Sequence, residues 1–145
     1  MVRWTAVACI PMILAGSAIA QQNVIAERQG LMRQMFAAVR PTFAMLRGQT
    51  PYDERVVQTA LQTIAANALR APDLFTGDSK TGDNTAALPL VWERRAEFES
   101  LLARLAQDAK AAQRTVVDEA RFRSEFPKVV ATCDTCHNTF RRKSS

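Results

Sequence analysis

Three side chains that can bind a metal or add to a carbon electrophile stand together near the C-terminal end of the 145-residue chain. Cys133, Cys136 and His137 form the pattern C-x-x-C-H, which is the attachment motif of c-type haem. On a helix, at about 100° per residue, Cys136 lies about 60° to one side of Cys133 and His137 about 40° to the other. Two thiols on one face can add to the vinyl groups of one porphyrin while the imidazole reaches its iron. The pattern therefore predicts one covalently attached haem c.

Other chemistries suit these residues less well. A thioredoxin-like C-x-x-C pair follows a strand, whereas this segment has helical periodicity. A zinc site needs four ligands, and the segment offers three. A disulfide between Cys133 and Cys136 would close a very small loop and leave His137 unexplained. An ordinary surface histidine is the remaining alternative for His137.

The first twenty residues are typical of an export signal. Arg3 precedes an apolar stretch from Ala6 to Ala15, and Ala18-Ile19-Ala20 has the small-x-small pattern of a cleavage site. The apolar stretch is shorter than the ~20 residues that span a bilayer, which disfavours a membrane anchor. We expect cleavage after Ala20 and a periplasmic domain of residues 21–145, with no membrane anchor after cleavage. The only cysteines left in that domain are Cys133 and Cys136 of the motif. In an oxidising compartment such thiols must be bridged, bound or modified.

Apolar residues recur every three or four positions in four stretches, which predicts four helices. The helices are expected at about Asn23–Arg47, Asp53–Arg70, Pro89–Gln113 and Asp118–Arg142. The third and fourth are joined by a short connection, as are the first and second, whereas a long polar segment, 71–88, separates the second from the third. No convincing strand is visible. The sequence therefore predicts an all-α fold, an antiparallel up-down-up-down four-helix bundle around covalently bound haem.

Single residues predict where these helices begin, bend and end. Asp53 is a good N-cap, and Gly48 is expected just past the end of the first helix. Pro41 is expected to kink the first helix, and Pro127 to bend the fourth or divide it in two. The inward stripe of the first helix is expected to include Met32 and Phe36.

Composition excludes several classes of protein. Hydrophobic residues make up 48% of the chain and charged residues 23%, which is ordinary for a globular domain and excludes disorder. The net charge of +5 comes from basic residues interleaved with acids, so we expect no nucleic-acid partner. A basic chain favours docking to an acidic partner surface.

The haem motif on the last of four helices resembles the class II c-type cytochromes, the family of cytochrome c′ and low-spin cytochrome c-556. The resemblance covers the whole mature chain. Other segments also match the family; each match is weak, but they occur in the same order along the chain as in the family. These segments are Gln29–Met32, Gly48–Asp53, Val91-Trp92 and Phe140-Arg141.

The resemblance implies roles for single residues. His137 matches the proximal iron ligand, and Met32 matches the position that covers the opposite haem face. In the c-556 type this methionine is the sixth ligand, whereas in cytochrome c′ the corresponding residue does not bind iron. We favour Met32 as the sixth ligand, with Met35 as a substitute; a plain core methionine is the alternative.

Further residues match positions around the haem in the family. Arg28 and Gln29 are expected to contact haem propionates, and an exposed helix charge is an equal alternative for Arg28. Trp92 and Phe140 are expected to pack near the haem, although core packing alone explains both. The family also implies a homodimer formed through the first two helices.

The sixth iron position decides the function. With His137 and Met32 both bound, the haem is low-spin and suits a single-electron carrier between periplasmic redox partner proteins. If Met32 does not bind the iron, the iron is five-coordinate and high-spin and binds NO or CO. An enzyme is not expected, because the chain has no second histidine to act as a distal acid or base.

Overall fold

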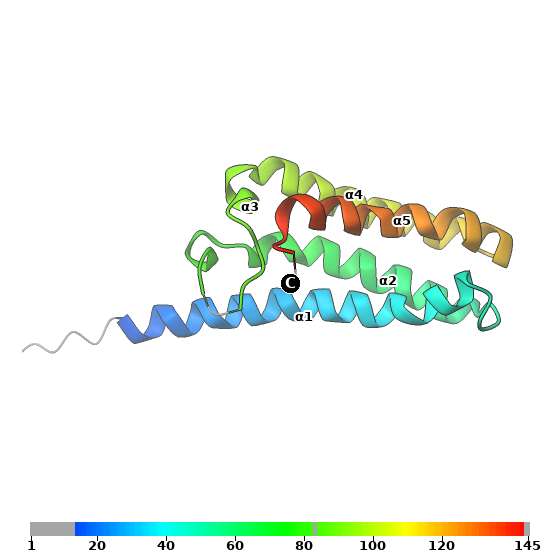
Figure 1. Ribbon diagram of the computed structural model, residues 1–145, viewed down its shortest axis with the longest axis horizontal. Helices are drawn as coiled ribbons and strands as arrows, with labels where there is room; N and C mark the ends of the chain where they lie inside the picture. Colours follow the sequence, from blue (N-terminus) through cyan, green and yellow to red (C-terminus); the bar gives the residue numbers. More distant parts are fainter. Residues whose placement is uncertain (1–13, 83, 144–145) are drawn as a thin grey trace, which may run out of the picture.

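Four long helices run antiparallel along the bundle (Figure 1), and the structure, a computed structural model, describes residues 14–82 and 84–143. The helices are α1 (Leu14–Leu46), α2 (Glu54–Arg70), the single turn α3 (Leu90–Glu93), α4 (Arg95–Thr115) and α5 (Glu119–Phe140). Two 3₁₀ turns, η1 (Ala71–Leu74) and η2 (Gly77–Ser79), lie in the long connection. Over these ranges the only β-type pairing is one bridge between Ala87 and Arg141. The predicted up-down-up-down bundle is confirmed.

Local sequence signals determine where the helices begin and end. The Asp53 carboxylate accepts hydrogen bonds from the amides of Arg55 (2.9 Å) and Val56 (3.3 Å), and so caps α2. Asp118 caps α5 in the same way, accepting from the Arg121 amide at 2.7 Å. Gly48 ends α1 with a left-handed φ of 69°, a conformation that glycine adopts readily because it has no Cβ.

The last helix is not divided at its proline, and the third helix differs from the sequence expectation, whereas the expected kink at Pro41 and bend at Pro127 stay predictions. Pro127 does not divide the last helix, because α5 continues unbroken from Glu119 to Phe140. Pro41 likewise lies inside α1, and both proline side chains are exposed. The expected third helix is instead interrupted at Arg94, whose φ of −113° and ψ of 46° separate α3 from α4. At this break the chain changes direction, from the long connection between α2 and α4 to the axis of the bundle.

The core consists of two apolar clusters along the bundle. The larger, here called the main cluster, joins α1, α2, α4 and α5 around Leu61, Phe122 and Phe126. The smaller lies at the motif end of the bundle and is here called the motif-end cluster. Its buried members are Leu31, Ala71, Phe75, Val91, Phe98, Leu102 and Phe140.

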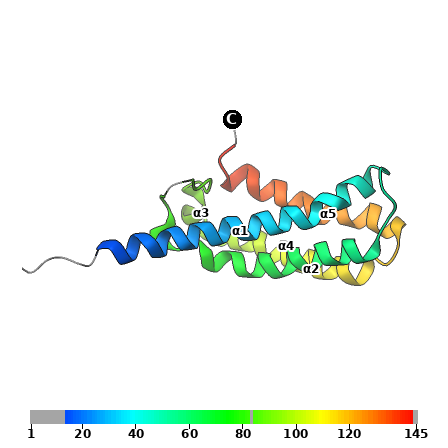
Figure 2. The ribbon, with the colours of Figure 1, turned by 90° about the horizontal axis from the view of Figure 1, so that it is seen from below.

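The helices pack in the order α1, α2, α4, α5, and α1 and α5 are not among the extensively packed pairs. In both ribbon views the C-terminal half of α5 stands apart from α1 (Figures 1 and 2). Near the other end, Arg123 of α5 donates to the carbonyl oxygens of Leu46 (2.8 Å) and Met45 (3.3 Å). The seam between α1 and α5 is therefore tied near one end and open beside the haem motif.

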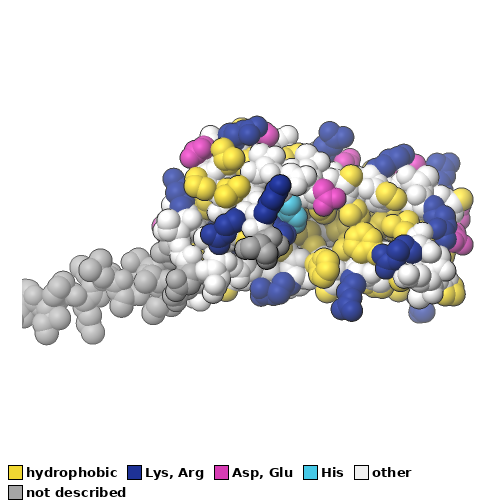
Figure 3. All heavy atoms as spheres, in the orientation of Figure 1, with side chains coloured by type: hydrophobic (Ala, Val, Ile, Leu, Met, Phe, Trp, Pro, Cys, Tyr) yellow, Lys and Arg dark blue, Asp and Glu magenta, His cyan; other side chains and the backbone are white. Residues whose placement is uncertain are grey.

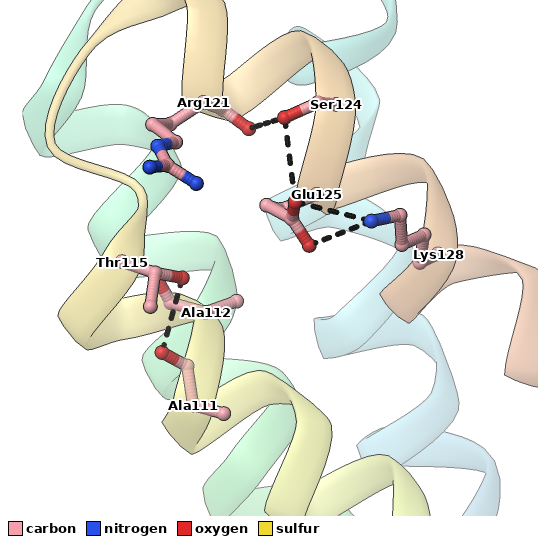
Figure 4. A network of polar contacts seen from close by, with 7 residues as sticks. All are labelled: Ala111, Ala112, Thr115, Arg121, Ser124, Glu125 and Lys128. Atoms are coloured by element: carbon pink, nitrogen blue, oxygen red, sulfur yellow. Dashed lines mark hydrogen bonds and ion pairs between the residues drawn. The ribbon is translucent and has the colours of Figure 1, made fainter.

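Most surface ion pairs follow the helix spacing, and one, between Arg70 and Glu27, joins α2 to α1. At the start of α5, Lys128 contacts both carboxylate oxygens of Glu125 at 3.0 and 3.1 Å, and the Ser124 hydroxyl donates to the Arg121 carbonyl (Figure 4). The hydrogen bond from Lys128 holds the pKa of Glu125 below its ordinary value. None of the helices in the described parts of the chain is long and apolar enough to cross a membrane.

Candidate haem-binding site

The last two turns of α5 present the three residues of the motif. Cys133, Cys136 and His137 are all half-buried, and no disulfide joins the two cysteines. Cys133 packs against the main cluster and Cys136 against the motif-end cluster. The histidine lies beside an apolar hollow that opens between the two edges of the molecule (Figure 3). The structure thus brings together the three residues that the sequence pattern singled out.

Burial favours the uncharged form of each of these side chains. Burial raises the pKa of Cys133, and burial together with the neighbouring Cys133 thiol raises the pKa of Cys136 to about 11. Burial, followed by the positive charge of Arg141, lowers the pKa of His137. A neutral imidazole has a free lone pair, which is the form that binds a metal.

The methionines of α1 near the motif differ in burial. Met32 is half-buried and belongs to neither cluster, whereas the adjacent Leu31 is buried in the motif-end cluster. Met35, the expected substitute ligand, is also buried. Phe36 is 64% exposed, so its expected place on an inward stripe is wrong. One turn apart on α1, Met32 and Phe36 lie on the same side of the helix.

The residues around the seam fit a haem. The donor set supplies two thiols and a neutral imidazole on one helix face, and apolar side chains such as Phe43 and Val130 lie part-buried on the two facing helices. The seam beside the motif is not closed by direct packing of α1 on α5. A flat, apolar ring system can therefore enter without displacing a packed interface.

Arg28 is buried, with 3% of its surface exposed, and it holds the long connection onto α1. Its guanidinium donates to the Ser79 hydroxyl (2.8 Å) and carbonyl (3.0 Å), to the Thr85 hydroxyl (2.7 Å) and to the Leu74 carbonyl (3.3 Å). Burial lowers the pKa of this group. Four of its five N–H donors are thus taken by the connection. Sequence reasoning missed this role, because nothing in 71–88 signals a partner on α1.

Gln29, Trp92 and Phe140 also border the motif end. The Gln29 amide donates to the Asn84 carbonyl at 2.8 Å. The Trp92 indole N–H donates to the carbonyl oxygens of Phe75 and Thr76, and its ring packs on the motif-end cluster. Phe140 is buried in the same cluster that Cys136 contacts.

Backbone pairing fastens the end of α5 to the long connection. The Leu88 amide donates to the Phe140 carbonyl at 2.9 Å, and the Arg142 amide donates to the Ala86 carbonyl at 2.8 Å. The motif therefore sits between the packed part of α5 and a second point of attachment. This pairing was also missed by the sequence analysis, which predicted no extended segment.

Within residues 14–82 and 84–143, no group of three or more His, Cys, Asp or Glu side chains is placed to hold a metal ion. The described site therefore offers one imidazole and two thiols on one helix, and not a zinc-type ligand set. A four-helix bundle with this arrangement on its last helix defines a class of protein, the bundle-type cytochromes with covalently bound haem.

Comparison with known proteins gives the family. The family described as cytochrome C′ matches residues 23–141. Cytochrome c′ of Rhodopseudomonas palustris is 43% identical over 143 residues, which cover 99% of this chain and 98% of the relative. Cytochrome c-556 of Agrobacterium tumefaciens strain II Chrys is 36% identical over 120 residues, covering 82% and 97%. The chain therefore belongs to the cytochrome c′ family.

A solved structure confirms the fold. A triple variant of Rhodopseudomonas palustris cytochrome c′ superposes with a TM-score of 0.82 and 45% identity, covering 83% of this chain and 98% of that chain. Its replaced residues include a glutamine at the first position and a tryptophan 71 positions later. Membership of the family makes the chain a haem protein with one covalently attached haem c, and not an enzyme.

Proposed function

We propose that this protein is of the cytochrome c′ type, with a five-coordinate haem iron that binds a small neutral gas such as NO or CO. The observation that carries the proposal is the 43% identity to a cytochrome c′ over nearly the whole of both chains, against 36% to a cytochrome c-556 over a shorter stretch. This reverses the preference drawn from the sequence, which placed the electron carrier first.

The surroundings of Met32 support this proposal. Its side chain is half-buried and packs with neither core cluster, so no neighbouring core residue holds its thioether in one orientation. An axial ligand that must be ordered on binding gives up side-chain entropy, which costs up to about 2 kcal/mol for methionine. The iron face opposite His137 is then bordered by apolar groups and open to an uncharged diatomic molecule.

A low-spin electron carrier with His137 and Met32 as ligands is the second candidate. The cytochrome c-556 relative favours it, and so does the presence of a thioether at Met32, which is a competent iron ligand. Methionine ligation raises the potential and would keep CO from the iron.

One optical experiment separates the two candidates. The oxidised wild-type holoprotein is expected to show a high-spin spectrum without the ~695 nm-type sulfur-to-iron band of Met/His ligation, and its reduced form is expected to bind CO readily. Met32→Ala should change both properties little, and Met45→Leu, a buried core methionine on the same helix, is the control. A charge-transfer band that disappears in Met32→Ala alone, together with CO binding that appears only in that variant, would establish the electron carrier.

We further propose thioether attachment at Cys133 and Cys136 and proximal ligation by His137. Their common face on α5 and the absence of a disulfide between them support this assignment. Haem should stay with the denatured, correctly matured protein through acid-acetone extraction, and complete extraction would refute the attachment. Replacing both cysteines by alanine should leave, at best, loosely held haem.

Export with cleavage after Ala20 is proposed on two grounds. The family match starts at residue 23, and residues 14–20 only prolong α1 at its N-terminal end; the rest of the expected signal, 1–13, lies outside the described residues. In the solved relative a tryptophan follows the first glutamine by 71 positions, and here Trp92 follows Gln21 by the same number. Mass spectrometry of the periplasmic protein should find Gln21, or its pyroglutamate, at the N-terminus, and a chain that retains Met1 would contradict cleavage.

Four supporting roles remain proposals. The Nε–H of Arg28 and the amide of Gln29 are donors near the motif end that suit haem propionates, and Trp92 and Phe140 suit packing against the haem. A homodimer is likewise proposed from the family resemblance. Analytical ultracentrifugation of the holoprotein tests the dimer, and a monomer at all concentrations would refute it.

A further inference from the structure

Asn67 is one of four buried polar or charged side chains among the described residues, and it lies on α2 with 5% of its surface exposed. Its neighbours on the buried face of that helix, Ile64 and Ala68, are apolar. Burying an amide is unfavourable unless the group is hydrogen-bonded, and an apolar residue would fill such a position at less cost. The contribution of Asn67 therefore lies in the bonds that it makes.

The two hydrogen bonds that the Asn67 amide donates both cross from α2 to α1. They end on the Leu31 carbonyl oxygen at 3.2 Å and on the Gln34 side-chain oxygen at 3.0 Å. The Leu31 carbonyl belongs to the backbone, so this contact holds the helix itself and not a side chain alone. Hydrogen bonds are directional, and two of them on positions three residues apart, on one side of α1, oppose rotation of α1 about its axis.

The other buried polar side chains have different tasks. The Thr42 hydroxyl donates to the Val39 carbonyl at 2.7 Å, within α1. The Ser79 hydroxyl donates to a carbonyl within the long connection, and Arg28 joins that connection to α1. Among the four buried polar side chains of the described residues, Asn67 is thus the one that joins two of the long helices.

The rotation of α1 sets the direction of Met32. Met32 follows Leu31 directly, about 100° further around the helix, so whatever holds the Leu31 backbone also directs Met32. The helix α2 packs on α1, whereas α5 is not among its extensively packed partners. A rotation of about 20° moves a Cα, which lies about 2.3 Å from the helix axis, by about 0.8 Å. Metal–ligand distances are defined to within about 0.2 Å, so such a rotation decides whether a thioether meets an iron.

We propose that Asn67 is a positioning residue for the sixth iron position, which fixes the rotation of α1 and thereby holds the Met32 thioether away from the iron. The inference rests on the proposed gas-binding function and deepens it, because it names the contact that leaves the iron face open. Asn67 itself touches neither the iron nor the gas. When its bonds are removed, α1 is free to turn, and the Met32 thioether, a competent iron ligand, competes with CO.

The test replaces Asn67 by leucine, which has the same branching but no donor, in the holoprotein. Oxidised Asn67→Leu should show the ~695 nm-type sulfur-to-iron band and a raised reduction potential. Its reduced form should bind CO about threefold more slowly, as expected when the thioether occupies roughly two-thirds of the molecules. Gln34→Ala removes one of the two bonds at an exposed position, and should shift all three properties in the same direction by less. This variant keeps the test open where Asn67→Leu does not fold.

Two matched variants separate positioning from stability. Thr42→Val also removes a buried hydrogen bond, but one that lies within α1, and it should leave the spectrum, the potential and the CO rate unchanged. Asn67→Leu/Met32→Ala should bind CO at the rate of Met32→Ala alone, because the effect of Asn67 acts through the thioether. Equal changes in Asn67→Leu and Thr42→Val would overturn the proposal. Slower CO binding in Asn67→Leu that persists when Met32 is alanine would also overturn it.

The spectrum of the wild-type protein tests the proposed function separately. If the wild-type protein already shows the sulfur-to-iron band, the gas-binding function is wrong, and Asn67 holds Met32 on the iron instead of away from it. In that case Asn67→Leu should weaken the band and Thr42→Val should not. A band of equal strength in the wild-type protein and in Asn67→Leu would overturn the positioning role as well.

Discussion

Replacing Arg28 by alanine is the change that best tests how the long connection is held. The guanidinium bonds to three residues of that connection, Leu74, Ser79 and Thr85, with distances from 2.7 to 3.3 Å. It also stacks over the Phe75 ring at 4.7 Å from the centroid. All of these contacts join α1 to a segment more than 45 positions further along the chain.

The expected cost follows from what the substitution leaves behind. Two carbonyl oxygens lose a donor, that of Ser79 in a buried place and that of Leu74 in a part-buried one. A buried group left without a partner costs about 1–3 kcal/mol. The two hydroxyl groups can turn to other partners, since Ser79 already donates to the Thr76 carbonyl. The Arg28 guanidinium is a buried charge without a carboxylate partner, so its burial is itself unfavourable. Its removal offsets part of the cost. Arg28→Ala should therefore lower the free energy of unfolding by about 2–4 kcal/mol.

Urea unfolding of the holoprotein measures this loss, and Arg33→Ala is the control. Arg33 lies five residues further along the same helix, is exposed and has no ion pair, so its replacement should change stability by about 0.5 kcal/mol or less. Hydrogen exchange should show the Ser79 and Leu88 amides losing protection in Arg28→Ala only. If Arg28→Ala lowers the free energy of unfolding by less than about 0.5 kcal/mol and leaves the protection of those amides unchanged, Arg28 does not hold the connection onto α1.

Three further predictions concern packing and charge. Phe98→Ala should cost about 3–5 kcal/mol because the ring is fully packed, whereas Phe36→Ala should cost about 0.5 kcal/mol or less; similar losses in urea unfolding would contradict the assigned core. Arg123→Ala should loosen the tied end of the α1–α5 seam, and an unchanged rate of amide exchange at the end of α1 would argue against this. Lys128→Gln should raise the pKa of Glu125 toward its ordinary value, as followed by NMR titration. Because the folded-state pKa is lowered, the small stabilisation is present above the ordinary pKa and is lost as pH falls through the folded value.

Sequence alone determined the features that depend on neighbouring residues. The spacing of Cys133, Cys136 and His137 specifies the attachment chemistry on any helix, because the geometry of one turn brings them to one face. Asp53 and Gly48 determine a helix start and a helix end through bonds made within a few residues. The apolar periodicity was enough to predict four helices and, from them, the bundle.

Tertiary structure decided everything that depends on residues far apart in the chain. Arg28 was expected either at the haem or in solvent, and its partners in the connection emerge only when segment 71–88 folds across α1. Phe36 fits an inward stripe by spacing, yet it is exposed because α1 and α5 are not packed together where it lies. Whether Met32 reaches the iron depends on that same distance between helices, which no pattern within either helix encodes.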